Sequence, residues 1–371
     1  MKTKITYILS DINKAIAFEW IVQNLDKEKF ELSFLLLNKY KNTHLEQFLI
    51  NSNISVSYIT LKSKKNYPLA FFKILIALIK IKPHIVHAHL RDANILGLIA
   101  AKILNIKKRI YTRHHSTFHH DNFPKAVKWD KMVNDWATNI IAISENVKNI
   151  LIKKENVPES KIYQIHHGFD LKTFACVKQK DVAILREKYI PNNKSLIIGV
   201  IARYINWKGH KYQIEAFKKI LEKYPNTFFV FANANGPDKR EIQDILQNNL
   251  LQDSYIEIEF ENDLFALYKL FDIYVHTPVN KEIEAFGQTY VEALASEIPS
   301  VFTLSGIANE FIIDKKNAIV VDYCNSKQIY EAIVTLIENK ELKNKLIFEG
   351  IESVKPFNLY TFINKLEAIY Q

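Results

Sequence analysis

The chain has 371 residues and a mass of 43.3 kDa, which exceeds one typical domain and predicts two. Hydrophobic residues make up 48% of the chain, so a sizeable core is expected and a disordered protein is excluded. The net charge of +10 is concentrated in residues 1–175, which hold 27 Lys and Arg against 14 Asp and Glu, whereas the rest holds 23 against 26.

In the front half, short apolar runs alternate with helical patterns such as 94–104 and 145–153. Continuous apolar strands separated by helices indicate a parallel sheet that is covered on both faces. The strands are expected at 5–9, 32–37, 54–59, 85–89, 109–112, 140–143 and 162–166.

The same pattern restarts after a polar stretch, 170–193, which we interpret as a linker. The fold class is therefore α/β, with two Rossmann-like, doubly wound domains that face a cleft, and ligands are expected at the carboxyl ends of the strands. The second set of strands is expected at 196–201, 228–232, 255–260, 272–276, 300–303 and 318–321. The helices among them include 212–223, 239–248 and 288–295, and a last amphipathic helix is expected at 358–371.

The cysteines, Cys176 and Cys324, are far apart and have no metal-type spacing, which favours a reducing compartment over a disulfide framework. The apolar run 5–9 is too short for a signal peptide, and no segment has the roughly 20 apolar residues that a bilayer span needs. We therefore expect a cytoplasmic protein.

The basic front half is either an ordinary solvated surface or a face that attracts an anionic partner, such as the inner face of the cytoplasmic membrane. The segment 69–81 is apolar and contains Lys73 and Lys80, so it is either an interfacial amphipathic helix or a covering helix of the front sheet. A nucleic-acid partner is not expected, because the basic residues are scattered and no nucleic-acid motif is found.

Two glutamates, Glu284 and Glu292, stand eight residues apart where an expected strand joins an expected helix. Phe286, Gly287 and Gln288 fall at the start of that helix, where backbone N–H groups can face an anion. Two carboxylates would repel a diphosphate, but they suit the hydroxyls of a sugar and a ribose. The alternative for Glu292 is a capping or solvent-facing role.

Arg203 follows another expected strand, and Lys208 stands just before Gly209 and an expected helix. Two fixed cations beside a helix N-terminus would neutralise the charge that develops on a leaving nucleoside diphosphate. The alternative is a pair of ordinary surface cations.

Four histidines lie within the segment 111–120, namely His114, His115, His119 and His120. A histidine that contacts the sugar is the favoured interpretation, and packing or surface roles come next. A metal site is not expected, because no carboxylate or cysteine completes a recognisable spacing.

Together these segments resemble glycosyltransferase family 4, whose members are retaining enzymes with the GT-B fold. Five motifs of that family occur here in the right order, so the resemblance covers most of the chain. They are the front-domain strand at 82–89, the crossover at 165–174, the Arg203 and Lys208-Gly209 pair, the E-x7-E signature at 284–292, and the following loop at 305–310.

The resemblance implies a role for each matching residue of the second domain. Arg203 and Lys208 would hold the donor diphosphate and act in catalysis. Glu284, also counted as catalytic, would bind the donor sugar, and Glu292 would bind the ribose. Backbone amides that contact the sugar or phosphate would come from Phe286, Gly287 and Gln288.

The resemblance also divides the chain into an acceptor-side domain at 1–175 and a nucleotide-sugar-binding domain at 176–355. A C-terminal helix at 356–371 would pack back on the first domain. His114 aligns best with the family's histidine near the donor sugar and is its catalytic candidate in the front domain, with His115 as the second choice.

The implied function is transfer of a sugar from a UDP- or GDP-linked donor to an acceptor hydroxyl. The product would be a bacterial surface polysaccharide, lipopolysaccharide included, or a lipid-linked glycan. No cofactor beyond the nucleotide-sugar is expected, and no catalytic metal, since the chain has no Asp-x-Asp motif. The alternatives are another GT-B enzyme, such as a sugar-nucleotide epimerase, and a non-catalytic partner that binds a nucleotide-sugar.

The chain departs from the family pattern at several points. The loop at 10–14 lacks the usual glycines, His167 replaces the crossover asparagine, and Ala285 and Glu297 replace two other glycines. These departures indicate an altered pocket and raise the expectation of an unusual donor.

Overall fold

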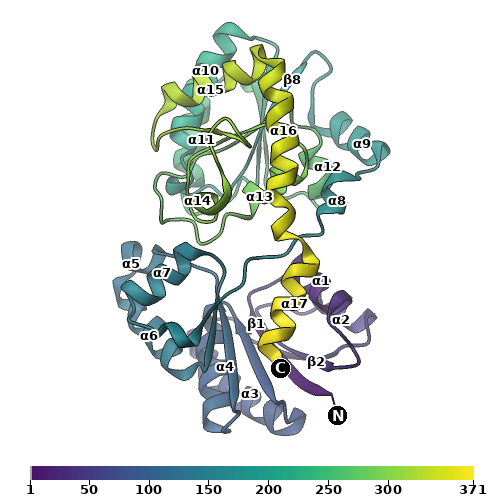
Figure 1. The fold of residues 1–371 in the computed structure, drawn as a ribbon, viewed down its shortest axis with the longest axis vertical. Helices are drawn as coiled ribbons and strands as arrows, with labels where there is room; N and C mark the ends of the chain where they lie inside the picture. The colour runs from purple at the N-terminus through teal and green to yellow at the C-terminus, as the bar shows by residue number, and fades with distance from the viewer. Residues whose placement is uncertain (1) are drawn as a thin grey trace. The chain divides into compact units, whose positions relative to one another are not determined.

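The computed structural model describes residues 2–371, and its internal contacts divide the chain into two compact units. The first unit consists of the residues up to Phe169 together with Leu359–Gln371, and the second consists of Asp170–Asn358. This division falls six residues before the boundary that the sequence analysis places at 175. Figure 1 shows the two units as separate sheets, each flanked by helices.

The first unit is built on a seven-stranded, wholly parallel sheet with the order β3-β2-β1-β4-β5-β6-β7. Its strands are β1 (Thr3–Ser10), β2 (Phe30–Asn38), β3 (Ser55–Thr60), β4 (Ile85–His89), β5 (Lys108–Arg113), β6 (Asn139–Ala142) and β7 (Ile162–Gln164). Its helices are α1 (Ile16–Asn24), α2 (His44–Asn51), α3 (Tyr67–Ile81), α4 (Arg91–Ile103), α5 (Phe118–Asn122), α6 (Val127–Trp136), α7 (Glu145–Lys153) and α17 (Leu359–Tyr370).

The second unit repeats the arrangement with a six-stranded parallel sheet in the order β10-β9-β8-β11-β12-β13. Its strands are β8 (Leu196–Ile201), β9 (Thr227–Ala232), β10 (Tyr255–Ile258), β11 (Ile273–His276), β12 (Ser300–Phe302) and β13 (Ile319–Val320). Its helices are α8 (Leu171–Ala175), α9 (Gln179–Tyr189), α10 (His210–Lys223), α11 (Lys239–Asn249), α12 (Leu264–Tyr268), α13 (Gln288–Ala295), α14 (Ala308–Phe311), α15 (Ser326–Glu338) and α16 (Lys340–Val354).

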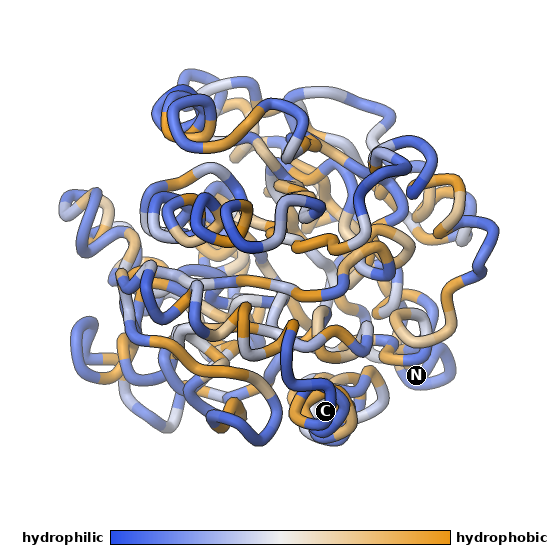
Figure 2. Tube along the Cα trace, turned by 90° about the horizontal axis from the view of Figure 1, so that it is seen from above, coloured by the Kyte–Doolittle hydropathy of each residue, from blue (hydrophilic) through white to orange (hydrophobic). Residues whose placement is uncertain are grey.

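These elements confirm the α/β fold class. Each expected strand is present, and its ends differ from the expected ones by at most two residues. The continuous apolar runs are buried because helices cover the faces of each sheet (Figure 1). In Figure 2, the helical coils carry both hydrophobic and hydrophilic residues. The interpretation of 170–193 as a linker is wrong, since α8 and α9 occupy most of it. Both helices are short and mostly polar, and each buries a single side chain, Phe174 and Leu185.

The C-terminal helix α17 belongs to the first unit and lies beside β1 in Figure 1. Its last residue, Tyr370, is buried, and its hydroxyl contacts that of Tyr7 and lies 2.6 Å from Nδ1 of His87. Nε2 of His87 lies 2.9 Å from the Thr112 hydroxyl. A buried polar chain therefore ties α17 to three neighbouring strands.

Candidate active site

The connection from β8 to α10 is shaped by Gly209, which has φ 81°. A Cβ at this position would lie 2.1 Å from the carbonyl oxygen of Thr277, so neither the backbone conformation nor the space admits a side chain. This close approach sets the start of α10 against the end of β11. Lys208 directly precedes this glycine and is thereby held beside the β11 segment.

Lys208, Glu284 and His276 meet at the carboxyl end of β11. The Lys208 ammonium lies 2.5 Å from Oε1 of Glu284, and Nε2 of His276 lies 3.2 Å from the same oxygen. The Glu284 backbone N–H also donates to the hydroxyl of Ser305, at 3.3 Å. The structure thus brings together two residues that the sequence analysis assigned to different parts of the donor.

The charge state of this cluster follows from its burial. Burial alone would raise the pKa of Glu284, but the charge of Lys208 and the hydrogen bond from His276 outweigh it and lower the pKa to about 2. Burial lowers the pKa of His276, so its ring is neutral at neutral pH and donates through Nε2. A carboxylate that stays ionised while buried is a strong acceptor for hydroxyl groups.

The start of α13 is built by two further glycines with positive φ. Gly287, at 84°, is the N-cap of α13, and Gly306, at 57°, packs its backbone against the carbonyl oxygen of Phe286. That carbonyl accepts a hydrogen bond from the Ile307 N–H at 2.9 Å. Phe286 is buried, whereas Gln288 is exposed in the first turn of α13, where helical N–H groups have no intrahelical partner.

Glu292 has a different environment from Glu284, although both are buried. Its Oε2 accepts a hydrogen bond of 2.8 Å from the hydroxyl of Tyr268. Burial raises the pKa of Glu292 to about 7, and the tyrosine hydrogen bond only partly offsets this effect. The two signature glutamates therefore differ in pKa. Because the Glu292 side chain is buried, it does not face solvent, and that alternative is wrong.

Arg203 is exposed just beyond β8, and its carbonyl oxygen lies 3.0 Å from Nε2 of His210. Its side chain is not part of the Lys208–Glu284 cluster. His276 is the residue of this cluster that the sequence analysis missed. For His276 a signal existed, because it is the last residue of a strand, and ligands are expected at the carboxyl ends of the strands.

His114 belongs to the first unit, so it is described separately. Its Nε2 lies 3.0 Å from Nδ1 of His89, and its ring stacks on that of His167 with centroids 5.7 Å apart. Burial lowers the pKa of His114 to about 4 and that of His167 to about 3, so both rings are neutral at neutral pH. Neutral imidazoles can exchange hydrogen bonds with hydroxyls without adding charge.

His115, the second choice for the sugar contact, points elsewhere. Its Nε2 lies 3.4 Å from Oδ2 of Asp130, and Nδ1 of His119 lies 2.7 Å from the same oxygen. The structure therefore supplies the carboxylate that the sequence pattern did not connect with these histidines. Asp130 stands 15 residues after His115, on a different element.

Comparison with known proteins gives two matches to family models. The model described as glycosyl transferases group 1 matches residues 181–353, and the model described as glycosyltransferase family 4 matches residues 21–173. The two matches together span most of both units. Among residues 2–371, no helix is long and apolar enough to cross a membrane.

Individual proteins agree with the family models. The capsular polysaccharide biosynthesis glycosyltransferase CapM of Staphylococcus aureus is 27% identical over 314 residues, covering 81% of this chain and 80% of CapM. The alpha-monoglucosyldiacylglycerol synthase of Acholeplasma laidlawii is 24% identical, covering 83% and 81%. The crystal structure of Anabaena HepE with UDP-glucose superposes with a TM-score of 0.84 at 18% identity, over 98% of each chain. The chain is thus a group 1 glycosyltransferase of the family 4 type, with the GT-B fold.

Proposed function

We propose that this glycosyltransferase takes a sugar from a nucleotide-sugar donor, UDP- or GDP-linked, and transfers it to an acceptor hydroxyl with retention of the anomeric configuration. The observation that carries the proposal is the cluster of Lys208, Glu284 and His276 at the carboxyl end of β11. It places a fixed cation and an ionised carboxylate beside a helix start, which is what a sugar diphosphate requires. HepE, crystallised with UDP-glucose on the same fold, supports the choice of donor class.

In this proposal, Lys208 binds the diphosphate and neutralises the charge that develops as the nucleotide leaves. Glu284 accepts hydrogen bonds from the hydroxyls of the donor sugar, and His276 keeps that carboxylate oriented. The N–H groups at the start of α13, from Phe286 to Gln288, face sugar or phosphate oxygens. Arg203 adds a second cation that can move to the diphosphate, since its side chain is exposed.

Glu292 is the proposed partner of the ribose hydroxyls. With a pKa of about 7, it is close to half protonated at neutral pH, so it can accept a hydrogen bond from one hydroxyl or donate one to another. His114 is the proposed residue of the first unit for contact with the sugar, on the strength of its alignment with the family and its neutral ring.

The proposed reaction proceeds on one face of the sugar. The bond between the anomeric carbon and the diphosphate oxygen breaks, and the acceptor oxygen bonds to that carbon on the same face. The proton of the acceptor hydroxyl passes to the leaving phosphate, so no protein nucleophile is needed. The side chains contribute positioning and charge stabilisation.

We further propose an acceptor in a surface polysaccharide or a lipid-linked glycan. CapM is named for capsular polysaccharide biosynthesis, and the Acholeplasma enzyme is named for synthesis of a glucosylated diacylglycerol. Acceptors of this kind lie at or near a membrane, so the enzyme would act as a peripheral protein on the inner face of the cytoplasmic membrane.

Helix α3 offers a surface for this attachment. Leu69, Phe72, Ile76 and Ile79 are each more than half exposed and form one stripe, which we call the α3 stripe. The opposite face of the helix, with Ile74 and Leu78 among its members, is buried in the unit. Exposed lysines stand before α3, within it and directly after it, and they are Lys62, Lys64, Lys65, Lys73, Lys80 and Lys82. An apolar stripe flanked by cations matches an anionic lipid surface.

A donor screen tests the proposed function. The melting temperature of the purified protein is measured with UDP, GDP and ADP and with their sugar conjugates, followed by release of nucleotide from each conjugate that binds. We expect one base to raise the melting temperature and its sugar conjugate to be turned over slowly by water. If no nucleotide stabilises the protein, the donor assignment is wrong.

A further inference from the structure

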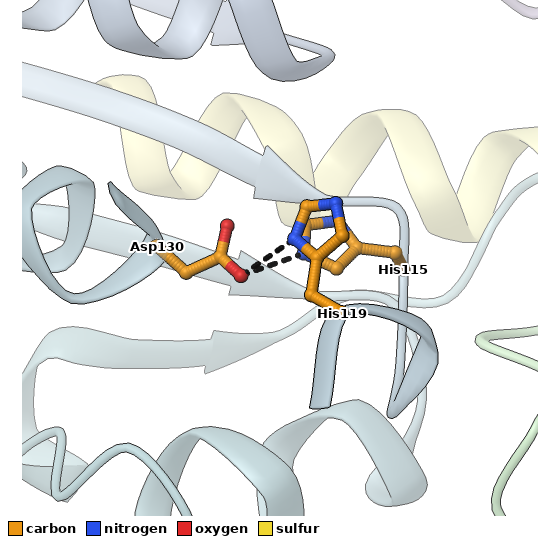
Figure 3. A group of neighbouring side chains, drawn as sticks. All are labelled: His115, His119 and Asp130. Atoms are coloured by element: carbon orange, nitrogen blue, oxygen red, sulfur yellow. Dashed lines mark hydrogen bonds and ion pairs between the residues drawn. The ribbon is translucent and has the colours of Figure 1, made fainter. Parts of the chain in front are cut away.

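We propose that the first unit binds one divalent transition-metal ion of the zinc class through His115, His119 and Asp130. The three side chains come from different segments: His115 from the loop after β5, His119 from α5 and Asp130 from the first turn of α6. Figure 3 shows both imidazole rings turned toward one oxygen of the same carboxylate. These three residues belong to the first unit, whereas the proposed donor residues belong to the second.

The spacing of the ligand atoms fits a small ion. One ring nitrogen of His115, one of His119 and a carboxylate oxygen of Asp130 all lie within 4.8 Å of one another. In a tetrahedral zinc shell, with bonds of roughly 2.0–2.2 Å, neighbouring ligand atoms stand roughly 3.3 Å apart. The contact of 2.7 Å between His119 and Asp130 must open slightly, because the ion replaces the proton that this hydrogen bond holds.

The charges around the site favour a cation. Asp130 and Glu155 are two buried carboxylates, and Arg113 is the buried guanidinium between them. Arg113 is committed to Glu155, with its closer contact at 2.6 Å, and it lies 3.6 Å from Asp130. The other basic partners of these carboxylates are imidazoles, His115 and His119 for Asp130 and His120 for Glu155. A divalent ion held by Asp130 and its two histidines would add fixed positive charge beside the two buried carboxylates.

The surroundings also hold the ligands in place. Nε of Arg113 donates to the carbonyl oxygen of His115 at 3.0 Å, which fixes the backbone of the first ligand. The His119 side chain is 12% exposed and the His115 side chain is 26% exposed, so an ion can enter from solvent and keep a water as its fourth ligand. Hydrogen bonds that hold the ligand residues, like the one from Arg113, are a usual feature of metal sites.

The identity of the ligands selects the class of ion. Two imidazole nitrogens and one carboxylate oxygen suit zinc, cobalt or nickel, whereas magnesium and calcium prefer oxygen ligands alone. Binding would join α5 and the preceding loop to α6. The same loop begins with His114, so the ion would fix the segment that carries this residue.

The test uses untagged, full-length protein that has been treated with a chelator and then titrated with ZnCl2, CoCl2 or MgCl2. We expect one zinc per chain after gel filtration, a higher melting temperature with zinc but not with magnesium, and a visible Co²⁺ spectrum of low-symmetry coordination. His119→Ala should weaken zinc binding at least tenfold, and Asp130→Asn should do the same. Asp121→Asn, which changes an exposed carboxylate of the same helix outside the ligand set, is the matched control.

His119→Ala is the primary variant, because His119 is half-buried while Asp130 lies beside the buried Arg113. Its metal-free melting temperature is compared with that of the wild type to establish that it folds. Absence of a stoichiometric ion in the wild type, or equal zinc binding by wild type and a folded His119→Ala variant, would overturn the proposal.

Discussion

At the scale of single residues, Lys208 is the proposed ligand of the donor diphosphate. Its ammonium contacts Glu284 and lies 4.5 Å from the centroid of the Trp207 ring, so it is held in place by charge and by an aromatic face. A lysine that is fixed before the diphosphate arrives loses little side-chain entropy on binding it. The ion pair also limits the cost of keeping Glu284 buried and Lys208 half-buried.

Replacing Lys208 by alanine should weaken binding of the nucleoside diphosphate by roughly 1.5–3 kcal/mol, which is the scale of a hydrogen bond between charged groups. The matched control is Lys211→Ala, because Lys211 is exposed on the first turn of α10 and is not in the cluster. Isothermal titration calorimetry measures both. Equal affinities of the two variants would remove Lys208 from the donor site.

Glu292 predicts a pH dependence of stability. Its pKa is about 7 in the folded protein and near 4.5 when unfolded, so the folded state binds the proton more tightly. The stabilisation is present below pH 4.5 and is lost as the pH rises to 7 and beyond. Glu292→Gln removes this dependence, so its stability relative to the wild type should improve between pH 5 and pH 8 by up to roughly 3 kcal/mol.

Denaturant unfolding of the wild type and of Glu292→Gln, at pH 5 and at pH 8, measures this change in stability. The difference between wild type and variant isolates Glu292 from the buried histidines, whose lowered pKa values act in the opposite direction over part of the same range. A difference that stays constant with pH would show that Glu292 is ionised throughout.

At the scale of elements, the Tyr370 hydroxyl is the buried polar contact between α17 and the first sheet. Tyr370 contacts both Tyr7 and His87, so Tyr370→Phe leaves two buried polar groups without this partner. The free energy of unfolding should fall by roughly 1–3 kcal/mol. Tyr360→Phe in the same helix is the control, because Tyr360 is 76% exposed, and it should change stability little. Equal effects of the two substitutions would exclude a special role for the buried chain.

The α3 stripe predicts binding to vesicles that contain anionic lipid. Replacing Phe72 and Ile76 by serine should reduce binding through lost apolar burial. Replacing Lys73 and Lys80 by glutamine should reduce it roughly 30-fold, since each lysine near an anionic leaflet is worth about 1 kcal/mol. Ile313→Ser, an exposed apolar position of the second unit, is the control.

Co-sedimentation at low and high salt measures this binding. We expect the wild type to bind anionic vesicles more tightly than neutral ones, and rising salt to weaken that preference. Binding that is independent of lipid charge and of salt would leave the electrostatic part of the docking proposal without support.

At the scale of the whole molecule, the sequence predicts the two sheets well, because buried parallel strands are continuous apolar runs that need no knowledge of their neighbours. It predicts the helix starts at Gly209 and Gly287 for a similar reason, since a positive φ leaves a local signature. It does not predict α8 and α9, whose mostly polar residues resemble those of a linker.

The side-chain clusters are only partly predictable. Lys208 and Glu284 are recognisable in the sequence, but their mutual contact and the part played by His276 depend on which strands become neighbours in the sheet. Asp130 could not be linked to His115 and His119 for the same reason. The three residues come from different segments and meet only when those segments pack together. Contacts that depend on tertiary packing leave no fixed spacing in the sequence.

The central claim is that the second unit binds a nucleotide-sugar and that Glu284 accepts hydrogen bonds from the hydroxyls of its sugar. The most direct measurement is a proton NMR time course of the best-binding nucleotide-sugar with the wild type and with Glu284→Gln. The account predicts that the wild type releases nucleoside diphosphate together with sugar that first appears in the donor's own anomeric form, and that Glu284→Gln binds the nucleotide but turns the donor over at least tenfold more slowly. First appearance of the opposite anomer, or unchanged turnover by Glu284→Gln, would contradict it.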